Sequence, residues 1–314
     1  MKVPSLLAAF LLLFLLLSEN IRGHTKAKQI DGIGFSGTVF LLPYNLGVFL
    51  GLREAGLTED RRIPLAGASG GAVTSSLSCS GASVQETIQG IQNIFKQCSD
   101  PPGVCIGNTS ILLLDLLERT IPKDSSFKRC DGHLHVELSE VINATVIPPC
   151  VTENVVGLQV SKFQSRHDLI TSLQGTTYLP RFIGPDCYTY FNEIKVIDGG
   201  YADNLPCPPN TDANGRFCLK VSAQPKEVWS KVQYKIAGDI YPGIRGNDTL
   251  TFDVNAYPNI SYNITACSEK FNDLVQAGKE DALFWLKINH HTVRSISNRH
   301  THRYRSHKHR QHHH

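Results

Sequence analysis

The chain has 314 residues, of which 41% are hydrophobic and 19% are charged. This composition suits a chain that buries a sizeable core, and it excludes an intrinsically disordered protein. The formal net charge is only +3, which excludes a protein whose whole surface is built to bind nucleic acid. The charge is also uneven. Residues 287–314 contain seven Lys or Arg and no acid, while the rest of the chain carries 24 basic and 28 acidic residues.

The N-terminus is typical of a secretory signal peptide. Lys2 precedes twelve uninterrupted apolar residues at positions 6–17. As a helix this run would rise only about 18 Å, which is too short for a hydrocarbon core of about 30 Å. We therefore expect residues 1–23 to be a cleaved signal, and the mature protein to be secreted or to reside in a lumenal or vacuolar compartment.

Residues 27–289 are predicted to form a single domain, because no repeat or long linker divides them. Short apolar or alternating runs predict strands at 30–35, 63–67, 133–141, 155–161, 193–197 and 217–222. Helical patterns occur at 43–55, 71–78, 84–95, 110–119, 168–173 and 269–288. Strands that alternate with helices predict an α/β fold, here a three-layer sandwich with a mainly parallel central sheet.

A Gly-x-Ser-x-Gly motif follows the second predicted strand. It reads Gly67-Ala68-Ser69-Gly70-Gly71 and leads directly into a predicted helix. A serine presented at a sharp strand-to-helix turn has a strained backbone, and side chains two residues away on either side would clash with it. The motif therefore predicts Ser69 as a nucleophile, with Gly67, Gly70 and Gly71 giving it room.

Asp198 is the predicted general base. It follows the predicted strand 193–197 and precedes Gly199 and Gly200, which let the backbone pass close beneath it. A turn carboxylate without catalytic function is the alternative. Asp203, five residues further on, is interpreted as a turn-fixing group. A histidine base is poorly supported, because beyond Asp198 the histidines all lie in the C-terminal tail and those at positions 133 and 135 alternate within a predicted strand.

These motifs, in this order, resemble those of the patatin-like phospholipase family, and within it the adipose triglyceride lipase branch. The similar elements are a Gly-rich loop, the motif around Ser69, and Asp198-Gly199-Gly200 followed by Asp203-Asn204-Leu205-Pro206. The resemblance covers roughly residues 30–287. It implies a Ser–Asp dyad without histidine that acts on lipid esters and needs no metal or other cofactor.

The family's oxyanion loop reads G-x-G-x-x-G, and two registers compete for it. The first contains Gly32 and Gly34 and satisfies the motif literally. The second begins at Gly37 and loses two glycines. If a helix began at Gly37, Pro43 would lie inside it at a cost of roughly 3 kcal/mol, whereas a helix that begins near Pro43 places this residue in a favoured first turn. We therefore expect oxyanion amides at Gly37, Thr38 and Val39.

The function predicted from these features is that of a serine lipid acyl hydrolase, either a triacylglycerol lipase or a phospholipase, working through an acyl-enzyme. Its partners would be lipid esters at membrane or lipid-droplet surfaces rather than nucleic acids. The alternative is a secreted, glycosylated storage or lipid-binding protein whose esterase activity is weak or vestigial, because the oxyanion loop lacks two of its glycines.

Cysteines and glycosylation sequons agree with secretion. Nine cysteines follow the signal and none forms a CxxC pair, so disulfides are expected rather than a metal or redox site. Cys98 with Cys105 and Cys207 with Cys218 are the local pairs that we expect. The odd number leaves one cysteine over. Glycosylation is predicted at five sequons: Asn108, Asn143, Asn247, Asn259 and Asn263.

Residues 290–314 are predicted to be a disordered tail, and they hold nine of the thirteen histidines. Histidine gains charge as the pH falls through about 6.5, so a pH-dependent contact with anionic membranes is one interpretation. A solvated tail without such a contact, and metal binding, are the alternatives.

Overall fold

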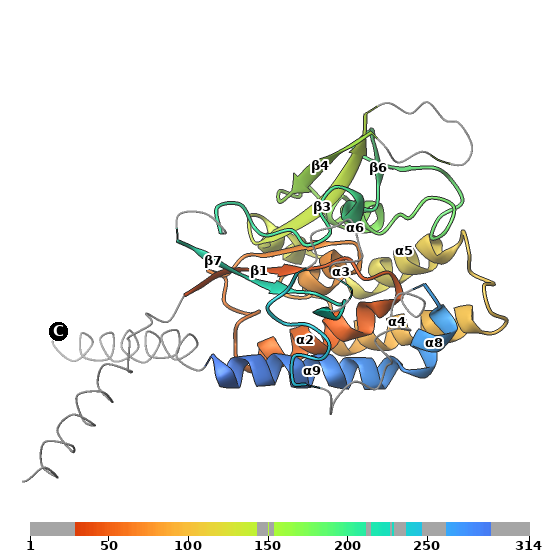
Figure 1. Ribbon diagram of the computed structural model, residues 1–314. Helices are drawn as coiled ribbons and strands as arrows, with labels where there is room; N and C mark the ends of the chain where they lie inside the picture. Colours follow the sequence, from red (N-terminus) through yellow and green to blue (C-terminus); the bar gives the residue numbers. More distant parts are fainter. Residues whose placement is uncertain are drawn as a thin grey trace, which may run out of the picture.

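The computed structural model describes residues 29–142, 150, 154–211, 215–226, 228, 237–246 and 262–289 (Figure 1). Its strands are β1 (Ile30–Phe35), β2 (Leu65–Ala68), β3 (Leu134–Val141), β4 (Val155–Val160), β5 (Thr189–Phe191), β6 (Ile194–Ile197) and β7 (Phe217–Val221). They form one mixed sheet of seven strands in the order β5-β6-β3-β2-β1-β7, with β4 paired to β3 off this path. The neighbours β3, β2, β1 and β7 are parallel, while β4, β5 and β6 join antiparallel. The predicted α/β class is therefore confirmed.

Helices occupy the stretches where the sequence predicts them, with small shifts at their ends. The α-helices are α2 (Leu42–Glu54), α3 (Gly70–Ser76), α4 (Val84–Ser99), α5 (Thr109–Thr120), α6 (Arg166–Thr176), α8 (Ile264–Glu269) and α9 (Phe271–Ile288). Three short 3-10 helices are η1 (Val39–Leu41), η2 (Ser125–Cys130) and η3 (Gly199–Tyr201). The predicted helix 269–288 is α9, which begins after a break at Lys270, and the short α8 that precedes it was not predicted.

Side-chain caps mark where two of these helices begin. The Ser83 hydroxyl accepts a hydrogen bond from the N–H of Glu86 at the start of α4, and the Ser165 hydroxyl accepts one from Asp168 at the start of α6. Each cap satisfies a backbone donor that has no partner within its helix. Two helices thus begin where the sequence carries a Ser-x-x-acid signal.

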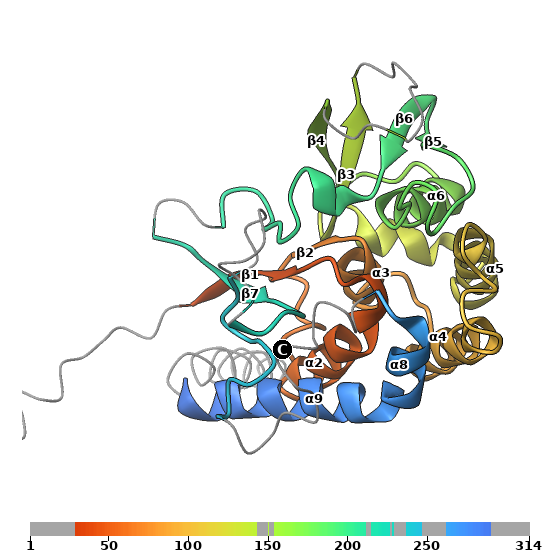
Figure 2. The same cartoon turned by 45° about the vertical axis from the view of Figure 1, so that its right-hand side comes forward.

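Helical segments lie on both sides of the sheet (Figures 1 and 2). Ile33, Leu65 and Leu134 are aligned in register on neighbouring strands and so share one face, where the apolar cores form. On this side α3 contacts β1, β2 and β3, and α6 contacts β3, β5 and β6. On the opposite face, η3 contacts β3, and residues 204–211 cross β1.

Helices α2 and α9 form the closest helix pair, at the bottom of Figure 1. A Cβ atom on Gly47 would overlap the backbone carbonyl of Val275, and one on Gly278 would overlap the carbonyl of Tyr44. These glycines let the two backbones approach more closely than any larger residue would allow. A partly buried ion pair between Arg245 and the buried Asp281 lies beside this contact, and Asp281 also accepts a hydrogen bond from the Tyr44 hydroxyl.

Four disulfides join the described cysteines. They are Cys79–Cys130, Cys98–Cys105, Cys150–Cys187 and Cys207–Cys218. The two local pairs predicted from the sequence are therefore confirmed. The ninth cysteine, Cys267, is buried and lies outside these four disulfides. Within the described ranges, no helix combines the length and the hydrophobicity needed to cross a bilayer.

Some predicted features fall outside the described residues. These are the signal peptide at 1–23, the tail at 290–314 and the sequons at Asn143, Asn247 and Asn259. The two remaining sequon residues, Asn108 and Asn263, are exposed and lie at the N-terminal ends of α5 and α8.

Candidate active site

Ser69 occupies the single residue between the end of β2 and the start of α3. Its backbone angles are φ 53° and ψ −131°, a conformation that side-chain-bearing residues rarely adopt. Its N–H donates a hydrogen bond of 2.8 Å to the hydroxyl Oγ1 of Thr176. The strained turn predicted from the motif is thus present, and a buried polar group holds it.

The glycines around Ser69 and Asp198 have no room for a side chain. A Cβ atom on Gly67 would overlap the backbone of Gly71 and Ala72, and one on Gly71 would overlap the carbonyl of Phe35. Added Cβ atoms would likewise overlap the Thr38 hydroxyl at Gly70, the Glu137 carbonyl at Gly199 and the Asn204 side chain at Gly200. Gly71 and Gly199 therefore mark places where separate backbone segments approach each other, Gly67 allows the tight turn around Ser69, and Gly70 and Gly200 make room for neighbouring side chains.

Asp198 is brought to Ser69 by strand β3. The strand β4 pairs with one edge of β3 along residues 136–141. The strand β2 pairs with β3 along 134–137, and β6 pairs with it along 139–140. Because both of these stretches overlap the β4 pairing, β2 and β6 must share the opposite edge of β3.

The two strands approach along this edge from opposite directions. The parallel strand β2 ends opposite Glu137, and the antiparallel strand β6 ends opposite Ser139. The residues that follow are Ser69 and Asp198, so both emerge near the middle of β3. The Ser139 hydroxyl donates to the Asp198 carbonyl oxygen at 2.8 Å and fixes that strand end.

The carboxyl group of Asp198 is buried and meets the Ser69 hydroxyl. Asp198 is 4% exposed and Ser69 is 6% exposed. Desolvation raises the pKa of Asp198 to about 6, although the adjacent Ser69 hydroxyl and the hydrogen bond from the Gly200 N–H act in the opposite direction. The Gly200 N–H binds Oδ1 at 2.8 Å, while the buried Oδ2 has no hydrogen bond of regular geometry within the described residues.

The segment after β1 lies directly beside Ser69. A Cβ atom on Gly37 would come within 3.4 Å of the Ser69 Cβ. The Gly37 N–H already donates to the carbonyl of Asn204 at 2.8 Å, so this amide is occupied, contrary to its expected use in an oxyanion hole. The N–H groups of Thr38 and Val39 donate to no acceptor within the described ranges. Val39 also has a φ of 49°, which is a strained value for a β-branched residue.

Gly32 and Gly34, which the alternative register places in the oxyanion loop, do not lie beside Ser69. Both lie within β1, on the face crossed by residues 204–211. A Cβ atom on Gly34 would overlap the carbonyl of Pro206, and one on Gly32 would come within 2.8 Å of Thr211. The literal G-x-G pattern therefore serves the close passage of this segment, which the Cys207–Cys218 disulfide ties to β7.

The other groups considered as bases lie elsewhere. No histidine of the described part lines the cavity beside Ser69. Burial lowers the pKa of His133 to about 4, and its ring lies at the far end of β3. Asp203 is exposed, and its Oδ1 accepts the N–H of Leu205 at 3.1 Å, as expected for a group that fixes a turn.

A small apolar cavity of about 60 Å³ adjoins Ser69. Val39 and Gly70 line it beside the serine, and the N–H of Gly70 also has no acceptor among the described residues. The rest of its wall is mostly apolar and comes from Phe40, Leu42, Val73, Ile91, Ile94, Phe95, Thr109, Leu113, Thr177, Leu179 and Ile183. This volume holds roughly two water molecules, so an acyl chain can enter only if side chains rotate aside.

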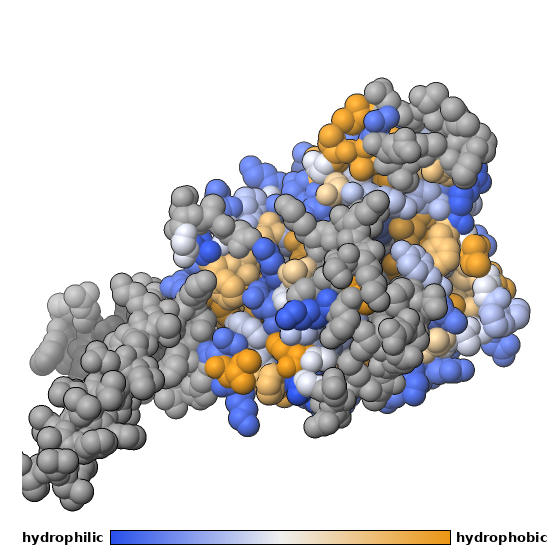
Figure 3. All heavy atoms as spheres, in the orientation of Figure 1, coloured by the Kyte–Doolittle hydropathy of each residue, from blue (hydrophilic) through white to orange (hydrophobic). Residues whose placement is uncertain are grey.

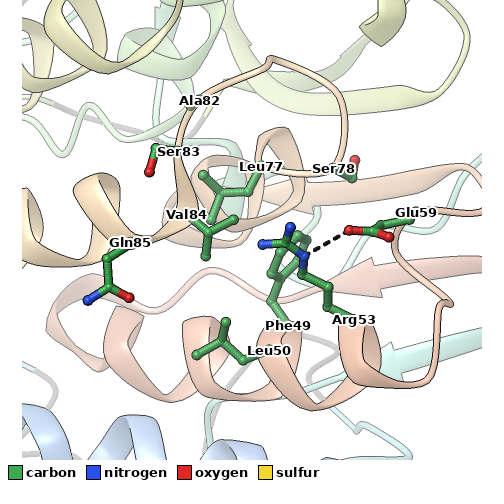
Figure 4. A pocket seen from close by; sticks show the side chains of 10 residues that line it. All are labelled: Phe49, Leu50, Arg53, Glu59, Leu77, Ser78, Ala82, Ser83, Val84 and Gln85. Atoms are coloured by element: carbon green, nitrogen blue, oxygen red, sulfur yellow. Dashed lines mark hydrogen bonds and ion pairs between the residues drawn. The ribbon is translucent and has the colours of Figure 1, made fainter.

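A larger cavity of about 360 Å³ lies between α2 and the start of α4 (Figure 4). Phe49, Leu77 and Val84 line it, and the ion pair of Arg53 with Glu59, 2.9 Å long, runs along it. The guanidinium charge is therefore already neutralised. None of the residues singled out by sequence motifs lines this cavity, which offers no nucleophile with a base.

Two buried residues at the candidate site carry no signal in the sequence. Thr176 accepts from the Ser69 N–H and donates to the Glu137 carbonyl, although it lies 107 residues from Ser69 in the chain. The Glu137 side chain lies beneath the segment after Asp198, and desolvation together with the charge of Asp203 raises its pKa to about 7. Only the three-dimensional structure identifies these residues, because no local spacing links them to a motif.

The sequence of this chain matches no protein-family model and no curated protein. Its candidate site is therefore defined by geometry: a strained serine, a buried carboxyl group in contact with it, and backbone N–H groups without an acceptor in the described part of the chain, all beside a small apolar cavity.

Proposed function

We propose that this chain is a serine lipid acyl hydrolase of the patatin-like type, with Ser69 as nucleophile and Asp198 as general base. The observation that carries the proposal is the contact between the Ser69 hydroxyl and a buried carboxyl group whose pKa is raised to about 6. An aspartate in water is too weak a base for this reaction, and burial moves its pKa closer to neutrality.

The mechanism has two halves. Asp198 takes the proton of Ser69 as Oγ forms a bond to the ester carbonyl carbon, and the carbonyl electrons move onto the oxygen. The N–H groups of Thr38, Val39 and Gly70 stabilise this oxyanion, each well-aimed donor contributing about 3–4 kcal/mol. Collapse breaks the bond to the alcohol, which leaves with the proton from Asp198. Water, deprotonated by Asp198, then attacks the acyl-enzyme; the bond from the acyl carbon to Ser69 Oγ breaks, Asp198 returns the proton to Oγ, and the acid is released.

Lipid esters are the proposed substrates because the cavity beside Ser69 is lined almost entirely by apolar side chains. The four disulfides are compatible with an oxidising compartment, so secretion or a lumenal location belongs to the same proposal. Triacylglycerols and phospholipids remain the two substrate classes, and a lipid panel with mass spectrometry of the products distinguishes them.

The dyad is tested with Ser69→Ala and Asp198→Asn, assayed on a medium-chain p-nitrophenyl ester. Both variants should lose hydrolysis to background, because one removes the nucleophile and the other the base. Asp203→Asn is the matched control, since it makes the same change five residues away on an exposed carboxylate and should keep activity. An Asp198→Asn protein that retains more than about a tenth of the activity would contradict the dyad.

Two further readouts sharpen this test. Because the base must be ionised, the activity of the unmodified protein should rise with pH through about 6 and then level off. A fluorophosphonate probe should label Ser69 in the unmodified protein and fail to label Ser69→Ala. If the folded, unmodified protein is not labelled, the chain is better described as a storage or lipid-binding protein with a vestigial site.

A further inference from the structure

Exposed hydrophobic side chains gather at one place on the surface. Of the nine large hydrophobic residues exposed in the described part of the chain, four lie close to the link between α4 and α5. We call these four the mouth patch: Val104, Ile106, Ile111 and Tyr262, with exposed fractions of 52–61%. Figure 3 shows hydrophobic residues on the right of the molecule, where Figure 1 places α5.

The four side chains belong to one continuous surface. Val104 and Ile111 line a hollow of about 300 Å³, and Ile106 and Tyr262 line a second hollow of about 240 Å³. Cys105 lines both hollows and is bonded to Cys98, seven positions earlier in the chain, so a short disulfide loop holds the centre of the patch. The apolar side chains are therefore displayed on a constrained loop.

This surface continues to the nucleophile. Phe40 and Thr109 line both the second hollow and the cavity beside Ser69. Aromatic rings form a series between them: Tyr262 contacts Phe182 at 6.0 Å, Phe182 contacts Phe40 at 5.7 Å, and Phe40 contacts Phe95 at 5.8 Å between ring centroids. An apolar chain that enters at the patch thus meets mostly apolar and aromatic side chains on its path to the cavity, with a few uncharged polar ones such as Thr109 between them.

The patch is almost uncharged. Among the described residues that line its two hollows, Asp100 is the one charged side chain, and no Lys or Arg takes part. An anionic headgroup therefore finds no partner here, whereas an uncharged apolar phase does. A second copy of the chain seated on the patch would close the path to Ser69, which makes it a poorer occupant than a lipid surface.

We propose that the mouth patch docks the protein on the uncharged surface of a lipid aggregate and delivers acyl chains along the aromatic path to Ser69. The proposal rests on the proposed function and adds to it the side of the molecule that meets the substrate. It differs from an electrostatic contact of the basic tail, because docking through the patch should be insensitive to salt.

The test replaces three residues of the patch, Val104→Ser, Ile106→Ser and Ile111→Ser, in one protein. A matched control carries Val156→Ser, Leu283→Ser and Ile288→Ser, three exposed hydrophobic residues away from the patch. Both triple variants are made in full-length protein with and without Ser69→Ala. Flotation with phosphatidylcholine-coated triolein emulsions then measures binding in the inactive background, independently of catalysis.

The patch variant should bind the emulsion at least about tenfold more weakly than the control, at low and at high salt. In the active background it should lose hydrolysis of the emulsion by a similar factor and keep that of a short soluble ester. Equal binding by the two triple variants would overturn the proposal. Emulsion binding without any ester hydrolysis by the unmodified protein would leave docking intact and remove the proposed function.

Two other possible occupants of the mouth patch, a second copy of the chain and the chain's own glycan, would give different experimental results. Sedimentation of a dimer that the patch variant converts to a monomer would show that a second copy covers the patch. Two predicted glycosylation residues also line the hollows, Asn108 the first and Asn263 the second. Binding by enzymatically deglycosylated protein but not by glycosylated protein would show that the chain's own glycan covers the patch. Either result would overturn lipid docking.

Discussion

At the scale of single residues, the position of Ser69 depends on a threonine that performs no chemistry. Thr176 is fully buried, and its hydroxyl bonds both the Ser69 N–H and the Glu137 carbonyl. It also lies close to Gly199, where an added Cβ atom would come within 2.8 Å of its Oγ1. One hydroxyl thus connects the turn at Ser69, the strand β3 and the segment that follows Asp198.

We predict that Thr176→Val lowers kcat on a soluble ester by roughly tenfold while KM changes little. Valine has the same shape, but it leaves the Ser69 N–H without an acceptor, so the strained turn loses its support. The control is Thr87→Val, a buried threonine in α4 whose hydroxyl donates to the carbonyl of Ser83, the N-cap of the same helix. A fall in kcat of equal size in both variants would assign the effect to general destabilisation instead.

Ser69 and Asp198, the proposed nucleophile and base, can be singled out from the sequence because each lies in a short glycine motif that follows a predicted strand. Thr176 and Glu137 cannot, since their importance comes from contacts between distant segments. The position of the proposed oxyanion loop could be predicted only in part. The helix-start argument at Pro43 points to the loop at residues 37–39, and Pro43 does lie in the first turn of α2. That the Gly37 amide is occupied by Asn204 appears only in the structure.

At the scale of secondary-structure elements, the α2–α9 contact depends on glycine. We predict that Gly278→Ala lowers the free energy of unfolding by about 1–3 kcal/mol, because the new methyl group would overlap the rigid Tyr44 carbonyl. This loss exceeds the gain of about 1 kcal/mol in helix propensity. Gly90→Ala in α4 is the control, since its methyl group would meet only the flexible side chain of Leu116. Denaturant unfolding compares the two, and equal stability would refute a close backbone contact.

The elements themselves are largely predictable, and the exceptions have physical causes. Strand β5 has three residues, too few to show a period, and it forms only by pairing with β6. The role of Gly32 and Gly34 was also beyond the sequence. The segment that makes those glycines necessary, residues 204–211, crosses β1 and lies more than 170 residues further along the sequence. Local periodicity carries no information about such a crossing.

At the scale of the whole molecule, two buried carboxyl groups make folding stability depend on pH. The pKa of Glu137 is raised to about 7 and that of Asp198 to about 6 in the folded state. The stability that these two protonated groups contribute to the folded state is therefore fully present below their pKa values in the unfolded chain, which lie near 4. It is lost as the pH rises through about 6 to 7, the pKa values in the folded protein. The folded protein binds these protons more tightly than the unfolded chain does.

We predict that Glu137→Gln becomes more stable relative to the unmodified protein as the pH rises from 5 to 8, with a slope of at most about 1.4 kcal/mol per pH unit. Glutamine keeps the shape and avoids burying a charge near Asp203. Glu140→Gln, on the same strand but partly exposed, is the control and should show a much flatter difference. Unfolding measured at several pH values gives both curves, and parallel curves for the two variants would contradict the predicted linkage.

The strands β2 and β6 meet along one edge of β3, and this arrangement restricts the distances that can separate Ser69 from Asp198. The spacing between the serine and the carboxylate is set by how many residues of β3 the two strands leave uncovered. Slipping β6 by one residue would move its end by roughly 3.3 Å and turn the acid to the other face of the sheet. The distance between the two groups can therefore change only in discrete steps. An insertion or deletion within either of these two short strands would therefore separate Ser69 from Asp198, the proposed nucleophile and base.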